Sequence, residues 1–266
     1  MAMKFCRTCG SSCTPVKVKR AAGAKTKGFF AKLPGAFGYP FRGFGLMILF
    51  LATGCFGAVD YLETIGLLGG PIGWIIWAAF YGLLFLFMQN IIHTTASDEN
   101  ETLGFPDAGE LFGGAFQMGF TILVCFGLPI GLLIARIFEV EVPMVAIIGS
   151  VIVGSLYFPM AFLAVAMKDT VLAMNPMVVV PTILRIPGEY LVATILLMSV
   201  FGINLLGNMV SGVAGGAMLE TRDMKVLLGS LGIQAVWSFV SIYLLSVNMR
   251  ILGLLYVTKK EKFGWF

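Results

Sequence analysis

Three cysteines near the start of the chain are the residues whose type and spacing could bind a metal. Cys6 and Cys9 form a C-x-x-C pair followed by glycine, and Cys13 lies four residues further on. This is the turn of one zinc knuckle, or half of a zinc ribbon, whereas a structural zinc site takes four ligands. The three cysteines are therefore candidate zinc ligands in an incomplete set, with a fourth ligand borrowed from elsewhere or from a second copy. A metal-free knuckle fits the same residues equally well.

His93 is the single histidine of the chain and the other candidate for chemistry. It follows a long apolar run and precedes Thr94 and Thr95, and no serine, aspartate or glutamate stands at a recognisable motif spacing from it. A lone histidine in this setting is typical of a polar residue at headgroup level. The sequence therefore predicts no catalytic residue, no cofactor beyond the candidate zinc, and no enzyme activity.

Several polar or charged side chains interrupt the apolar runs and could act at membrane depth. The positions that we single out are Gln117, Lys168, Asp169, Asn204, Asn208 and Arg250. Such groups mark solute pathways, and they also link helices through hydrogen bonds worth about 0.6 to 2 kcal/mol each. The linking role is favoured here, because the first five predicted spans contain no Asp, Glu, Lys or Arg.

Composition sets the class of protein that must position these residues. The 266 residues are 58% hydrophobic and only 12% charged, which departs strongly from a soluble domain. The expected fold is an all-α, polytopic integral membrane helical bundle of about six transmembrane helices. Nucleic acid is not an expected partner, because the basic residues lack the folded context of a phosphate-tracking surface.

Six runs are long and apolar enough to cross a hydrocarbon core about 30 Å thick. They cover residues 43–59, 72–92, 111–135, 144–167, 190–209 and 228–247. Together they make residues 43–258 a six-helix transmembrane domain. Ser150 and Gly154 form a small-residue face for close helix approach, and Pro129 should kink its helix. The last run is placed so that Arg250 lies near its end, where it can snorkel to the headgroups.

The distribution of basic residues predicts the orientation. Residues 1–42 hold nine of the 18 basic residues and no acidic residue, so this tail should be cytoplasmic, disordered and attracted to anionic lipids. Six spans put 15 basic residues inside and three outside, with both termini cytoplasmic. Residues 259–266 should form a cytoplasmic C-terminal anchor, in which Trp265 and Phe266 return to the headgroup layer.

The stretch between the fourth and fifth spans is broken by Pro176, Pro181 and Pro187. Its apolar core is too short to cross, and each proline removes an amide donor and disfavours helix before it. Residues 175–187 should therefore be irregular or short-helical at the cytoplasmic face. Whether they lie at the interface or re-enter a protein-lined space stays open, with the interface favoured.

The second half of the chain resembles a family of uncharacterised bacterial polytopic membrane proteins classed as a domain of unknown function. The resemblance lies in YFPMAFLAVAMKDTVLAMNPMVVVPTILRIP and in the ending RILGLLYVTKKEKFGWF, and CRTCG looks like the zinc-ribbon knuckle that such proteins sometimes carry. It implies a shared bundle fold in a bacterial cytoplasmic (inner) membrane, and it assigns no activity to any residue.

Three classes of function remain. The favoured one is a structural or accessory subunit that binds membrane lipids and either a membrane-protein partner or further copies of itself, because small-residue faces, phenylalanine and methionine are abundant. The alternative is a transporter or channel for a small solute. A membrane enzyme is the least favoured class, because it would need a base, a nucleophile or a metal that the sequence does not offer.

Overall fold

The computed structural model describes residues 4–5, 12–13, 28–64, 66, 70–97, 111–220 and 224–265. Helices account for most of these residues, which confirms the predicted all-α membrane bundle. Two short strands, β1 (Lys4–Phe5) and β2 (Ser12–Cys13), pair antiparallel with Lys4 opposite Cys13. The strands therefore bracket the segment that carries the first two cysteines.

Six long helices correspond to the six predicted spans. They are α2 (Gly45–Thr64), α3 (Gly70–Ser97), α4 (Leu111–Ile137), α5 (Met144–Lys168), α7 (Pro187–Glu220) and α8 (Met224–Phe263). Within the described residues, all but α2 are long and apolar enough to cross a membrane alone. The described part of α2 qualifies only together with the helical segment before it, from which it bends by 68°. The chain is therefore a multi-pass membrane protein with five or six crossings.

The ordered bundle begins earlier than predicted. Helix α1 (Phe29–Gly38) and the 3-10 turn η1 (Tyr39–Phe41) occupy residues that the sequence assigns to the disordered tail. That boundary at residue 42 is wrong, because Phe29, Ala36 and Tyr39 are buried and α1 packs along α8. Apolar residues in this part of the tail supply a packing face that outweighs the basic character of the segment.

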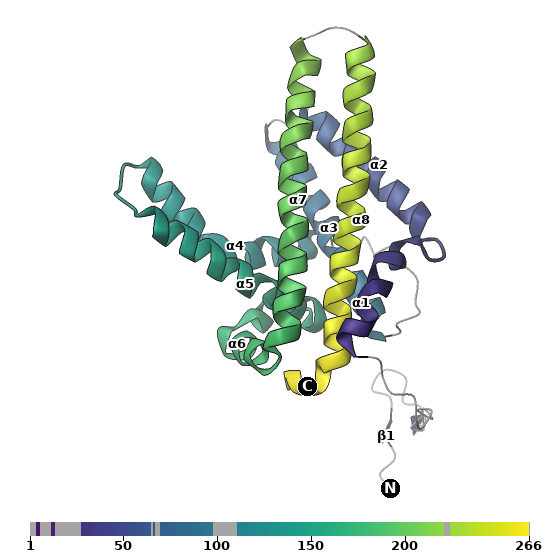
Figure 1. The fold of residues 1–266 in the computed structure, drawn as a ribbon, viewed down its shortest axis with the longest axis vertical. Coiled ribbons are helices and arrows are strands. Elements are labelled where there is room, and N and C mark those ends of the chain that lie inside the picture. The colour runs from purple at the N-terminus through teal and green to yellow at the C-terminus, as the bar shows by residue number, and fades with distance from the viewer. Residues whose placement is uncertain are drawn as a thin grey trace.

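Helix α8 is the element around which the others are arranged. It packs against α1, α2, α3, α6 and α7, and it forms a long hairpin with α7 (Figure 1). The sequence ends the last span near residue 247, but α8 continues to Phe263 and its residues 246–255 are all buried. The polar residues in this stretch therefore face other helices.

The densest core lies at one end of the molecule, which we call the base. Residues 158–166 of α5 and 246–255 of α8 are wholly buried there, together with most of residues 85–92 of α3. Helix α6 and the C-terminus lie at this end, from which the α4–α5 hairpin projects away from the α7–α8 hairpin (Figure 1). The projecting hairpin exposes large apolar side chains such as Leu128 (68%) and Val153 (67%), as a lipid-facing surface does.

Glycines allow several helices to approach closely. A Cβ atom at Gly154 would collide with the Cys125 carbonyl of α4, which confirms the predicted close approach at the small-residue face of α5. A Cβ atom at Gly82 of α3 would collide with the Leu111 carbonyl at the start of α4. At Gly253 of α8 it would lie 2.6 Å from the Cβ atom of Thr95 of α3. These positions need glycine because another helix occupies the space.

The proline-broken stretch is short and helical, as predicted. The 3-10 turn η3 (Val171–Met174) leads into α6 (Pro176–Arg185), whose N-cap Asn175 accepts a hydrogen bond from the Met177 amide. Pro176 occupies the first turn of α6 and Pro187 begins α7, where a missing amide leaves no carbonyl without its donor. The 10-residue α6 is too short to cross a membrane and joins the basal ends of α5 and α7.

Substitution at the α3–α8 crossing tests the close approach. Gly253→Ala should lower stability by about 1–3 kcal/mol, because its methyl group overlaps the buried Thr95 side chain. Thermal unfolding in detergent measures this. Gly232→Ala, in open space on the same helix, is the matched control and should be neutral or stabilising. Equal melting temperatures for the two variants would contradict the close approach.

Candidate functional site

Polar side chains from three helices converge at the base in what we call the basal polar network, formed by Gln89, His93, Gln117 and Asp169. The Ala166 carbonyl of α5 accepts hydrogen bonds from Gln89 Nε2 (3.1 Å) and His93 Nε2 (2.8 Å). Asp169 Oδ1 accepts from Gln89 Nε2 (3.3 Å) and Gln117 Nε2 (3.1 Å). Since a carbonyl only accepts, the His93 bond assigns its proton to Nε2.

The end of α5 creates the need for this network. The last four carbonyls of a helix have no donor within the helix, and Ala166 lies two residues before the end of α5. Asp169 follows in the left-handed conformation (φ 51°), which aspartate tolerates better than most residues and which terminates the helix. Gln89 and His93, four residues apart on one face of α3, supply the missing donors.

Two of the predicted membrane polar positions, Gln117 and Asp169, are thus brought together. The amide nitrogen of Gln117 is used in the bond to Asp169, while its Oε1 atom is buried without a hydrogen-bond partner among the described residues. Lys168, a third predicted position, is half-buried at the end of α5 beside Asp169. The arrangement joins α3, α4 and α5 at a single point.

Arg250 lies in the core, so its predicted snorkelling position is wrong. Only 4% of the residue is exposed, and its guanidinium carbon lies 4.4 Å from the centroid of the Tyr39 ring. Its Nη1 donates to Thr95 Oγ1 at 3.0 Å, and that hydroxyl donates to the Ile91 carbonyl at 2.6 Å. The prediction considered only the sequence of the last helix. The Tyr39 ring that shields the Arg250 guanidinium comes from η1, far away in the chain.

The end of the chain folds back as a hook, which comprises residues 262–265. Trp265 Nε1 donates to Thr182 Oγ1 of α6 at 3.0 Å, and Arg185 Nη1 donates to the carbonyls of Lys262 (3.2 Å) and Phe263 (3.3 Å). Gly264 has a φ of 64°, which reverses the chain after α8. The prediction that Trp265 anchors in the headgroups is wrong, because it is buried beside Tyr256 and Phe263.

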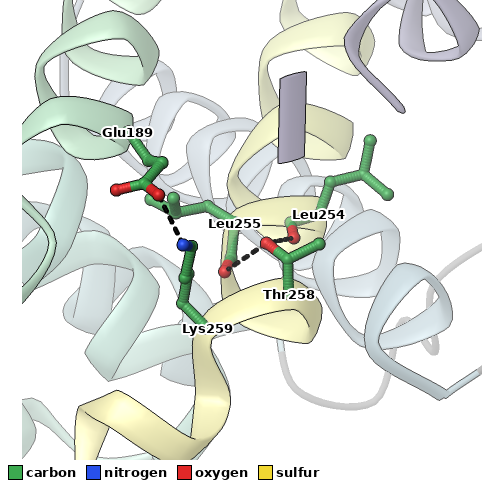
Figure 2. Close-up of polar contacts among 5 residues, drawn as sticks. All are labelled: Glu189, Leu254, Leu255, Thr258 and Lys259. Carbon is green, nitrogen blue, oxygen red and sulfur yellow. Dashed lines mark hydrogen bonds and ion pairs between the residues drawn. The ribbon is translucent and has the colours of Figure 1, made fainter. Parts of the chain in front are cut away.

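An ion pair joins α7 to α8 just above the hook. Figure 2 shows Glu189 against Lys259, with Thr258 on the same turn donating to the carbonyls of Leu254 (2.8 Å) and Leu255 (3.2 Å). Glu189 and Arg185 each bind the last turns of α8, so that α6, α7 and α8 are held together at the base.

Other predicted positions fall outside the described residues. This holds for Cys6 and Cys9 and for the side chains of Cys13, Asn204 and Asn208. In the described part of the chain, no group of three His, Cys, Asp or Glu side chains could hold a metal ion. The zinc hypothesis therefore stays a prediction for the N-terminal cysteines.

The sequence indicated several of the polar positions at the base but not the residues that they contact. Tyr39, Thr95 and Thr182 were not singled out, because each is an ordinary residue type whose role depends on a distant segment. One available signal was the four-residue spacing of Gln89 and His93, which places both side chains on one helix face. That face now meets the end of α5.

Comparison of the chain with family models, curated proteins and solved structures gives no match. The fold itself defines the class of protein, a multi-pass helical membrane protein. Within that class, several of its polar side chains form links between helices at the base.

A double-mutant cycle tests the hook. Thr182→Val and Trp265→Phe should each lower the melting temperature, and the pair should couple by about 1 kcal/mol because they remove one shared hydrogen bond. Thermal unfolding in detergent gives the cycle. Trp74→Phe, at a site 78% exposed, is the matched control and should change little. Strict additivity of the two variants would show that the bond does not form.

A second cycle tests the shielding of Arg250. Arg250→Met and Tyr39→Leu should show a coupling of about 1–2 kcal/mol, because a desolvated guanidinium over an aromatic ring is stabilised by roughly that amount and each change removes this interaction. The stability of the two single variants and the double variant in detergent measures it. A coupling of zero would place the cation away from the ring.

Proposed function

We propose that the chain is an integral membrane structural or accessory subunit that binds other membrane proteins or lipids. One observation carries the proposal: several polar side chains at the base form hydrogen bonds that hold helices together. Gln89 and His93 bond to a carbonyl of α5, Gln117 bonds to Asp169, and Arg250 bonds to Thr95. Groups engaged in this way act as links between helices.

The projecting α4–α5 hairpin supports a binding role. Helix α4 is the least buried of the candidate spans. Only 17% of its most apolar 18-residue stretch is buried, whereas the value for α8 is 61%. Its exposed side chains include Phe112, Phe116 and Leu128, and α5 adds Val145 and Val153. A surface of this chemistry takes acyl chains or the apolar helix of a partner.

The proposed setting is a bacterial cytoplasmic membrane with both termini on the cytoplasmic side. The 15 to three division of basic residues supports this orientation. The contact of α1 with α8 and the position of the C-terminus at the base are in agreement with it (Figure 1). The base would then face the cytoplasm.

The second candidate is a transporter or channel for a small solute. Gln117 is the observation that favours it, because its buried Oε1 has no partner in the described residues and lies on the side chain that reaches Asp169. An oxygen without a donor could receive one from a solute. Enzyme activity is not proposed, since His93 makes a bond to a backbone carbonyl.

Photo-crosslinking tests the proposed binding surface. A benzophenone side chain at Leu128 of α4 or at Val153 of α5 should capture a stoichiometric partner protein or lipid after purification in gentle detergent. The matched control is the same side chain at Phe162 of α5, which is 1% exposed and should give only intramolecular products. Mass spectrometry identifies the captured species.

Reconstitution separates the two candidate functions. The purified chain alone in liposomes should move no solute and turn none over. If it does so, and Gln117→Leu abolishes the flux, the transporter function replaces the proposed one.

A further inference from the structure

Helix α6 has one buried face and one exposed apolar face. Val179 and Thr182 are buried, whereas Met177 (84%) and Leu184 (71%) are exposed, with Val180 between them on the same side. Leu172 of η3 is exposed in the same way (81%). We call the exposed residues Leu172, Met177, Val180 and Leu184 the α6 ridge.

The buried face is held by the hook, and this fixes which way the ridge points. Thr182 accepts from Trp265, and Arg185 donates to the carbonyls at the end of α8. The same contacts bring the backbone of Lys262 next to α6. Lys260 and Lys262 are both exposed. The helix therefore cannot turn its ridge inward without breaking these bonds.

The charges around the ridge are predominantly basic. Residues 168–189 and 259–262 contain five basic side chains, Lys168, Arg185, Lys259, Lys260 and Lys262, and three acidic ones, Asp169, Glu189 and Glu261. Glu189 is paired with Lys259, and Asp169 accepts amide bonds from Gln89 and Gln117. A surface with an apolar ridge and an excess of lysine and arginine beside it suits an anionic membrane surface.

The order of the helices places this surface near the level of the lipid headgroups. Helix α6 connects the end of α5 to the start of α7, so it lies where two candidate spans leave the membrane on the same side. We propose that the α6 ridge, together with Lys260 and Lys262 in the last turn of α8, forms a binding surface for anionic phospholipid headgroups in that leaflet. The ridge side chains insert among the upper acyl carbons while Lys260 and Lys262 contact phosphates. This inference rests on the lipid-binding part of the proposed function and names the lipid and the surface.

Depth-dependent fluorescence quenching tests the proposal on the full chain in nanodiscs. An NBD probe on Met177→Cys or Leu184→Cys, in a background where all five native cysteines are replaced by alanine, should be quenched by lipids brominated near the headgroup. Brominated phosphatidylglycerol should quench more strongly than brominated phosphatidylcholine at equal mole fraction. Val179→Cys is the matched control on the buried face and should resist labelling until the protein is denatured.

Charge variants complete the test. Lys260→Gln with Lys262→Gln should reduce the preference for the anionic lipid by about twofold to fivefold for each lysine, while quenching by brominated phosphatidylcholine persists. A probe at Met177 that no brominated lipid quenches would overturn the proposal, and so would equal quenching by both lipids in the unaltered protein. Both measurements are independent of solute flux and of partner capture, so their failure is distinguishable from failure of the proposed function.

Discussion

The exclusion of water from the packed interior is the constraint on which this structure depends, since a polar group buried there is costly unless it finds a partner within the protein. The end of α5 shows the consequence, because the Ala166 carbonyl has no donor in its own helix and receives two from α3. The bonds that meet this requirement also fix which helices are neighbours. Packing at the base therefore follows from hydrogen-bond satisfaction as much as from apolar burial.

The same constraint explains why α8 is central. Arg250 facing lipid near mid-membrane would cost about 2.5 to 3.5 kcal/mol, so a helix that carries it is stable only when other segments surround it. Tyr39 and Thr95, from η1 and α3, provide that environment. Gly253, one turn further along α8, removes the side chain that would otherwise keep Thr95 away. The burial of Arg250, its contact with Tyr39 and the close approach of α3 to α8 at Gly253 therefore depend on one another.

Composition and run length were sufficient for the class of fold, because hydrocarbon thickness imposes a length that can be counted along a sequence. The short α6 was predictable for the same reason, as prolines act locally. Contacts between distant segments were not predictable. Tyr39 and Arg250 are 211 residues apart in the sequence, and Trp265 and Thr182 are 83 residues apart. Helix α1 and η1 were not predicted, because the many lysines of the N-terminal segment make its average composition polar. Phe29 and Tyr39 are nevertheless buried individually against other helices.

The register of the α7–α8 hairpin accounts for the error at Arg250. Glu189 of α7 pairs with Lys259 of α8, and further along the hairpin Gly207 packs against the indole of Trp237. The apolar run 190–209 therefore lies opposite residues 237–258 of α8, whereas sequence reasoning placed the last span at 228–247. Two antiparallel neighbours that cross together must present their apolar runs at the same height, so the crossing part of α8 shifts toward its C-terminal end. Arg250 then lies within the paired part of α8, where it is buried between helices and covered by the Tyr39 ring.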